Sequence, residues 1–155
     1  MRIYLMRHGA APSAKEAGVD KDFDRPLSDL GRKNARKAAS YIAKNGGAPA
    51  KILVSPLIRA QQTAAEVATV LNGDPENFEP LANQVDGMTL IRRLTEDYSY
   101  VTEVLLIGHQ PQIGEAANYL TGLYFELRPA GVIGLERDDR GKTAVLWAAN
   151  PDEYA

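Results

Sequence analysis

The stretch "IYLMRHGAAP", residues 3–12, sets a short apolar run directly against an arginine, a histidine and a glycine. The run has the length and composition of a buried strand, and we expect the first strand at residues 2–6. Arg7 and His8 then stand at the carboxyl end of that strand, ahead of a long polar loop. In open α/β sheets, ligand sites lie at this end of the strands. The stretch therefore predicts a strand that presents two polar side chains to a ligand.

Strand-like and helix-like segments alternate along the rest of the chain. We expect further strands at residues 51–55, 78–81, 103–109, 130–136 and 143–148, and helices at residues 28–45, 56–71, 88–97 and 111–120. The last two strands flank the turn-rich "RDDRGK" and are predicted to form a hairpin. Alternating strands and helices imply a layered α/β domain with a mostly parallel sheet, to which the hairpin adds an antiparallel element.

Capping residues help to place two of these helices. Ser28 suits the N-cap of the first long helix, and Gly46 suits its end. Ser55 suits the N-cap of the next helix, with Pro56 at the first helical position. This assignment puts Arg59 in the first turn of that helix.

Composition narrows the class of protein. A chain of 155 residues predicts a single domain over residues 1–155. The net charge of −2 gives no case for binding nucleic acid or a membrane surface, and the lack of cysteine excludes disulfides and thiolate metal sites. No run approaches the roughly 18 apolar residues of a membrane span, and the N-terminal run is too short for a secretory signal. We therefore expect a cytoplasmic protein.

The chain has two histidines, His8 and His109, and both stand at the carboxyl end of a predicted strand. For a single histidine, a surface or core position would be the simpler interpretation. Two histidines at equivalent strand ends weaken that interpretation and favour a common site.

Arg59 is unusual for its position. The first turn of a helix carries the positive end of the helix dipole, which favours acidic residues. An exposed arginine could be tolerated there at a cost of a few tenths of a kcal/mol. A bound anion would resolve the conflict, and a guanidinium fork suits phosphate. A metal-dependent hydrolase using His8, His109 and a carboxylate is the weaker alternative, because the arginines would repel the ion.

Arg25 ends the polar loop that follows Gly9. A loop of about eighteen residues is long for a compact domain, and such loops are commonly functional. Arg25 could reach a phosphate, or it could pair with Asp22 or Asp24. Both alternatives stay open.

Three segments together resemble the histidine phosphatase superfamily: "RHG" after the first strand, "SPLIRAQQTA" after the second, and "GHQP" after a later one. The chain length, "RPLSDLGRKNA" and "LLIGHQPQIG" look most like its small SixA-type phosphohistidine phosphatases. The resemblance covers residues 2 to about 122 and, less clearly, the final hairpin. It implies a phosphoglycerate mutase-like fold, a three-layer α/β/α sandwich.

The resemblance also implies roles for particular residues. His8 matches the nucleophile that becomes transiently phosphorylated, and Arg7, Arg59 and His109 match the residues that hold the phosphoryl group. Arg25 matches a position in the "RPL" segment that faces the same pocket. The family uses no metal and no cofactor. These roles predict a phosphatase acting through a covalent phosphohistidine intermediate.

The class of substrate that such a site can hydrolyse depends on whether the leaving group needs a proton donor. An alkoxide needs a proton donor, whereas the imidazole of phosphohistidine can be protonated before its bond breaks. Asp86 and Glu115 are the nearest candidate donors, although each is more simply explained as a solvated carboxylate. A short chain leaves little room for a cap over the pocket. We therefore expect a partner that is a histidine-phosphorylated protein, such as a phosphotransfer domain, with small phosphate monoesters or a non-catalytic phosphate-binding module as alternatives.

Overall fold

A computed structural model describes residues 1–82 and 84–154. Within them a six-stranded sheet has the order β3-β2-β4-β1-β5-β6. The strands are β1 (Arg2–Arg7), β2 (Lys51–Val54), β3 (Pro75–Asn77), β4 (Glu103–Gly108), β5 (Val132–Arg137) and β6 (Thr143–Ala149). The helices are α1 (Ala14–Ala17), α2 (Asp29–Lys44), α3 (Ile58–Leu71), α4 (Gly87–Tyr98) and α5 (Gln112–Thr121), with 3₁₀ turns η1 (Asp22–Asp24), η2 (Glu79–Ala82) and η3 (Pro151–Glu153).

The sheet is mostly parallel, as predicted. Strands β3, β2, β4 and β1 run in one direction, and β5 and β6 form the expected antiparallel hairpin beside β1. The parallel register pairs Arg7 with Gly108. Because His8 and His109 follow these two paired residues, they emerge from adjacent strands at the same edge of the sheet.

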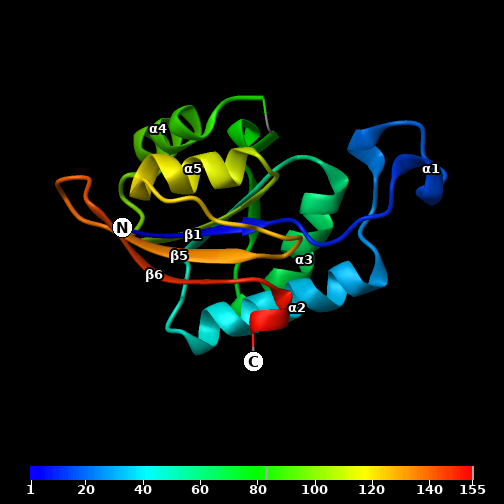
Figure 1. Ribbon diagram of the computed structural model, residues 1–155, viewed down its shortest axis with the longest axis horizontal. Coiled ribbons are helices and arrows are strands. Elements are labelled where there is room, and N and C mark those ends of the chain that lie inside the picture. Colours follow the sequence, from blue (N-terminus) through cyan, green and yellow to red (C-terminus); the bar gives the residue numbers. More distant parts are fainter. Residues whose placement is uncertain (83, 155) are drawn as a thin grey trace.

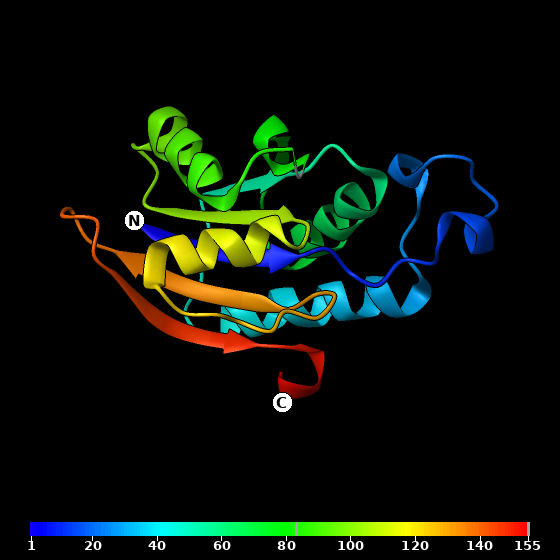
Figure 2. The same cartoon turned by 45° about the horizontal axis from the view of Figure 1, so that its top comes forward.

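Helices cover both faces of the sheet, which confirms the three-layer sandwich (Figures 1 and 2). Side chains alternate between the faces, as the two-residue period of a strand requires. Ile3 and Leu5 lie in the core under α4 and α5, whereas Tyr4 and Met6 lie in the core over α2 and α3. Within the part of the chain that the structure describes, no helix has the length and apolar character needed to cross a membrane.

The amino end of α2 packs tightly on the loop that follows β1. A methyl group added at Gly9 would lie 2.7 Å from the carbonyl oxygen of Gly31, and one added at Gly31 would overlap the carbonyl oxygen of Ala10. Ser28 caps α2 as predicted, accepting a hydrogen bond from Gly31 N. Its own backbone N–H donates to Ala10 O at 2.9 Å. Small residues on both sides therefore let a helix approach the backbone next to His8.

Three expectations about elements need correction. Helix α3 begins at Ile58 with Leu57 as its N-cap, so Ser55 and Pro56 precede it rather than start it. The expected strand at residues 78–81 is mostly the 3₁₀ turn η2, and β3 lies just before it. The polar loop contains α1 and η1, which extend beyond the carboxyl end of β1 (Figure 1).

Candidate active site

His8 is buried at the tip of β1, with both ring nitrogens in defined contacts. Its Nδ1 lies 2.7 Å from the carbonyl oxygen of Gly9 and must carry the hydrogen, because a carbonyl can only accept. Nε2 is therefore the nitrogen with a free electron pair, and Arg59 Nε donates to it at 3.3 Å. The carbonyl of Gly9 therefore fixes the tautomer of His8.

Burial controls the charge of His8. Removal from water lowers its pKa to about 3, and this effect outweighs the hydrogen bond to Gly9 O, which raises the pKa. The positive charges of Arg59 and Arg7 also lower the pKa, but burial is the larger cause. His8 is consequently neutral at pH 7 and has a nucleophilic nitrogen.

His109 lies beside His8, with the ring centroids 5.1 Å apart. Its Nε2 is 2.7 Å from Ser55 Oγ, which also accepts a hydrogen bond from Leu57 N. We infer that Ser55 donates its hydroxyl hydrogen to Nε2, so that His109 carries its own hydrogen on Nδ1. That Nδ1 is buried without a hydrogen bond to any described residue. Burial, then the charge of Arg59, lowers the pKa of His109 to about 4. His109 is a neutral donor for a ligand.

Arg7 supplies a second donor. Its Nη1 donates to the carbonyl oxygen of Leu127 at 2.9 Å, and its buried Nε has no partner among the described residues. One edge of the guanidinium is therefore fixed by the backbone while Nε remains available to a ligand.

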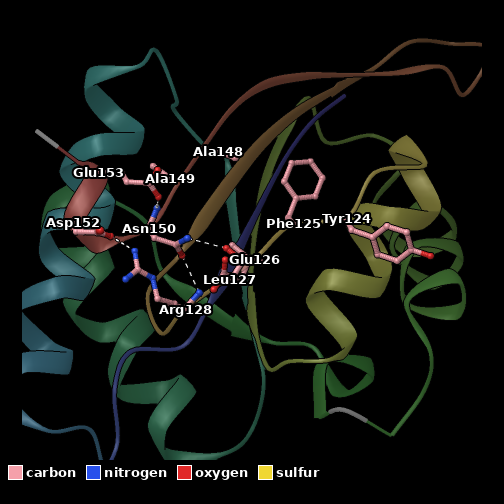
Figure 3. Close-up of a pocket in the computed structure, with 10 residues that line it drawn as sticks. All are labelled: Tyr124, Phe125, Glu126, Leu127, Arg128, Ala148, Ala149, Asn150, Asp152 and Glu153. Carbon is pink, nitrogen blue, oxygen red and sulfur yellow. Dashed lines mark hydrogen bonds and ion pairs between the residues drawn. The ribbon is translucent and has the colours of Figure 1, made fainter.

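A pocket of about 590 Å³ adjoins the segment that fixes Arg7 (Figure 3). Asn150 joins its two walls, accepting from Arg128 N and donating to Glu126 O, each at 2.8 Å. Arg128 also pairs with Asp152, whereas the ring of Tyr124 points away from this group. These contacts hold the backbone of Leu127 where Arg7 meets it.

Arg59 is buried in the first turn of α3, as predicted. Its Nη1 donates to the carbonyl oxygen of Asp22 at 2.9 Å, and its Nη2 donates to the Asp22 carboxylate at 3.1 Å. Thr63, one turn further along α3, accepts from Gly9 N at 3.0 Å and donates to Arg59 O at 2.7 Å. Helix α3 therefore positions both Arg59 and the loop after His8.

Three further residues of this site, Ser55, Thr63 and Asp22, are not predicted from the sequence. The sequence pattern places Ser55 at a helix cap, and its partner His109 lies 54 residues away. For Asp22 the pattern suggests only a pair with Arg25. The signal for Asp22 is the burial of Arg59, because a buried guanidinium needs hydrogen-bond acceptors.

Arg25 contacts the loop rather than the two histidines. Its Nη1 pairs with Asp22 Oδ1 at 3.0 Å, Nε donates to Pro12 O at 2.8 Å, and Nη2 donates to Ala11 O at 3.2 Å. The structure thus shows the pair with Asp22 that the sequence leaves open, and a role of Arg25 in binding phosphate stays a prediction.

The carboxylates of Asp86 and Glu115 both accept hydrogen bonds from backbone N–H groups at the amino end of α4. Asp86 is its N-cap and accepts from Thr89 N at 2.7 Å. Hydrogen bonding from the side chain and the backbone of Thr89 holds the pKa of Asp86 below its usual value. Glu115 Oε1 accepts from Gly87 N at 3.2 Å. Both line a pocket of about 500 Å³ with Gln110. Asp86 and Glu115 are therefore neither simply solvated nor seen in contact with the two histidines, and the role of proton donor stays a prediction.

The assembled site suits an oxyanion. A neutral histidine nucleophile lies among donors from Arg7, Arg59 and His109, and the two guanidinium groups provide positive charge where water is largely excluded. Among the described residues, no three histidine, aspartate or glutamate side chains gather as a metal site would require. The geometry matches in-line attack on a phosphoryl group whose equatorial oxygens need stabilisation.

Comparison with known proteins agrees with this chemistry. Residues 3–84 match the model of the histidine phosphatase superfamily (branch 1). The chain is 35% identical to an uncharacterized protein of Picosynechococcus, covering 87% of this chain and 84% of that protein. It is 33% identical to phosphohistidine phosphatase SixA of Escherichia coli, covering 97% and 94%.

Among solved structures, the protein histidine phosphatase SixA complexed with tungstate superposes with a TM-score of 0.85 at 25% identity, covering 98% of both chains. The fold, the residues of the site and the relatives agree. The chain belongs to the histidine phosphatase superfamily and is a phosphatase of the SixA type.

Proposed function

We propose that this protein removes the phosphoryl group from phosphohistidine in a partner protein, without a metal ion, through a covalent intermediate on His8. The observation that carries the proposal is the state of His8: Nδ1–H is fixed by Gly9 O, and Nε2 is unprotonated beside Arg59. Such a nitrogen can attack phosphorus without first losing a proton.

The first step exchanges one imidazole for another. His8 Nε2 forms a bond to phosphorus while the P–N bond of the substrate breaks. When the distal nitrogen of the substrate ring is protonated, the ring leaves as neutral imidazole. The new phosphohistidine on His8 keeps its hydrogen on Nδ1, bonded to Gly9 O. No proton changes hands between the two rings, so this step needs no general acid.

In the second step, water attacks the phosphorus on His8. The P–Nε2 bond breaks, both hydrogens of the water leave with the phosphate as its monoanion, and His8 regains its neutral form. Arg7, Arg59 and His109 would stabilise the equatorial oxygens in both steps. Splitting the reaction in this way replaces one difficult displacement by two easier ones.

The carboxylate at the site also favours phosphohistidine over esters. Asp22 is the carboxylate that contacts Arg59, and hydrogen bonding from Arg25 holds the pKa of Asp22 below its usual value. An ionised carboxylate cannot protonate a departing alkoxide. A histidine-phosphorylated protein, for instance a phosphotransfer domain in signal transduction, is therefore the proposed partner. The cytoplasmic location expected from the sequence stays a prediction.

The test compares wild type with His8→Ala on three substrates in the presence of a chelator: a phosphohistidine protein, a phosphoserine peptide and a small aryl phosphate. We expect wild type to act fastest on phosphohistidine and His8→Ala to lose about a thousandfold or more. Lys44→Ala, an exposed change at the far end of α2, is the control and should match wild type.

Three other outcomes would favour a different function or overturn the mechanism. Comparable turnover of the aryl phosphate would favour a small-molecule phosphatase of the same mechanism. Binding of phosphate without turnover of any substrate would favour a non-catalytic module. An active His8→Ala protein, or dependence on added metal, would overturn the mechanism.

A further inference from the structure

Both terminal nitrogens of the Arg59 guanidinium are occupied by one residue of the polar loop. Asp22 accepts from Nη1 through its backbone carbonyl at 2.9 Å and from Nη2 through its carboxylate at 3.1 Å. The Arg59 side chain is 9% exposed, whereas the Asp22 side chain is 65% exposed. A buried cation of the site is therefore covered from the solvent side by an anion of the chain itself.

The loop holds this anion in place. Asp22 opens the 3₁₀ turn η1, and Arg25 at its end pairs with the other carboxylate oxygen of Asp22 at 3.0 Å. Arg25 in turn donates to the carbonyl oxygen of Pro12 at 2.8 Å, in the part of the loop that leaves β1. The carboxylate is thus attached by a short, internally braced segment, and its effective concentration at Arg59 is high.

We propose that Asp22 is a specificity-determining residue: a tethered competitor that occupies the Arg59 fork in the free protein and that an incoming phosphoryl group must displace. The inference rests on the proposed function only in so far as the site binds a phosphoryl group. It does not depend on which molecule carries that group.

Displacement makes the site select by charge. Replacing one carboxylate by a monoanion leaves the total charge beside Arg7 and Arg59 unchanged, so the exchange gains little. Replacing it by a dianion adds a negative charge next to the guanidinium groups of Arg7 and the buried Arg59. Terminal phosphoryl groups, which are dianionic near neutral pH, should therefore enter, and carboxylates, phosphodiesters and inorganic monoanions should be excluded.

Tungstate and perrhenate provide a matched pair of probes, because both are tetrahedral oxyanions of nearly equal size, with two negative charges and one respectively. Their dissociation constants can be measured by titration calorimetry on wild type, Asp22→Asn and Asp24→Asn. Asp24 is an exposed carboxylate at the end of the same turn and serves as the control. The asparagine at residue 22 keeps an oxygen acceptor but removes the competing charge.

We expect wild type and Asp24→Asn to bind tungstate much more tightly than perrhenate. Asp22→Asn should bind both more tightly, by about three- to tenfold for perrhenate, with a smaller gain for tungstate, so that discrimination falls. Unchanged or weaker binding of perrhenate in Asp22→Asn would overturn the proposal and leave Asp22 as a residue that merely positions Arg59.

A second measurement uses wild type alone, so its result does not depend on whether Asp22→Asn disturbs the loop. Hydrogen exchange of peptides covering residues 19–26 should become faster when tungstate binds, because η1 leaves Arg59. Slower exchange would mean that the loop closes over the anion, which contradicts displacement. Neither measurement uses turnover, so a failure of phosphohistidine hydrolysis and a failure of this inference are seen in different experiments.

Discussion

Two buried histidines at one site are both kept neutral by burial, but their hydrogen-bond partners differ. His8 has its Nδ1–H on the carbonyl of Gly9, while His109 receives a hydroxyl hydrogen from Ser55 on Nε2. The two rings therefore present opposite functions to a ligand: an electron pair from His8 Nε2 and a hydrogen from His109 Nδ1. Histidine can supply either an electron pair or a hydrogen-bond donor, because in each ring the partner of one nitrogen determines which nitrogen carries the hydrogen.

The lowered pKa values of these histidines predict how stability depends on pH. The values are about 3 for His8 and about 4 for His109, against 6.5 in the unfolded chain. Between pH 6.5 and 4 the unfolded state binds protons that the native state does not, so the free energy of unfolding falls as the pH falls. From pH 7.5 to 5.0 we expect a loss of roughly 2 kcal/mol for each histidine.

Urea denaturation at the two pH values checks this expectation. The His109→Gln variant, which cannot titrate there, should lose about half as much stability as wild type over the same interval. The interval stays above the range in which carboxylates titrate, so their protonation adds little. Equal stability of wild type at pH 7.5 and 5.0 would contradict the prediction.

At this scale the sequence predicts that the candidate groups lie together, but it does not predict the residues that support them. His8, Arg7, Arg59 and His109 stand at strand ends and in a first helical turn, and those positions follow from local periodicity. The contacts made by Ser55, Thr63 and Asp22 join segments 37 to 54 residues apart. No local pattern encodes such contacts, which depend on how the elements pack.

Among the elements, the amino end of α2 has the closest relation to the loop that carries the site. Gly31 lies against Gly9 and Ala10, the two residues that follow His8. On the opposite face of the sheet, Gly87 of α4 makes a comparably close approach to Ala116 of α5. The first contact adjoins the two histidines, and the second belongs to the packing of two helices.

Substituting each glycine by alanine separates these roles. Gly31→Ala and Gly87→Ala should each destabilise the fold by about 1–3 kcal/mol, because overlap with neighbouring backbone outweighs the roughly 1 kcal/mol gain in helix propensity. Only Gly31→Ala should also lower kcat/KM for an aryl phosphate, since it displaces the loop after His8. Thermal unfolding and kinetics well below the transition measure both effects. A Gly31→Ala protein with the kcat/KM of Gly87→Ala would show that this contact does not position His8.

The elements also show where the apolar pattern of the sequence predicts the observed helices and strands. Strands β1 and β4 and helices α2, α4 and α5 follow the apolar pattern because each buries one face or both. The beginning of α3 does not follow the capping pattern, because the hydroxyl of Ser55 contacts His109 instead. At residues 78–81, buried Phe78 and Leu81 resemble a strand, but Pro80 lies between them and the segment folds into a 3₁₀ turn.

Across the whole molecule, the sheet separates two apolar cores that share its strands. In β4, Leu106 belongs to the core under α4 and α5, and the next residue, Ile107, belongs to the core over α2 and α3. Strands β1, β2, β4 and β5 contribute to both cores, so neither layer can lose its packing without loosening the sheet. This arrangement is what a single cooperative domain requires.

The single domain remains a prediction, and Trp147 offers a test. This tryptophan lies on β6 and stacks on Tyr4 with ring centroids 5.8 Å apart, on the α2 and α3 side. Leu106→Ala removes side-chain volume from the other core and should cost about 2–5 kcal/mol. In a cooperative domain, the unfolding transition seen by Trp147 fluorescence shifts by the same amount as that seen by circular dichroism. A Trp147 transition that does not move would indicate two independently unfolding parts.

The place of β1 in the sheet has a consequence for newly made chains. This strand leaves the ribosome early, yet it pairs with β4 and β5, and the partner of Ile3 is Val104. At roughly 5–20 residues per second, about a hundred further residues take on the order of 5–20 seconds to synthesise. During that time an apolar strand lacks both neighbours and is open to pairing with other chains. We therefore expect nascent chains to need shielding of this segment, and the two histidines to come together only after β4 has been made.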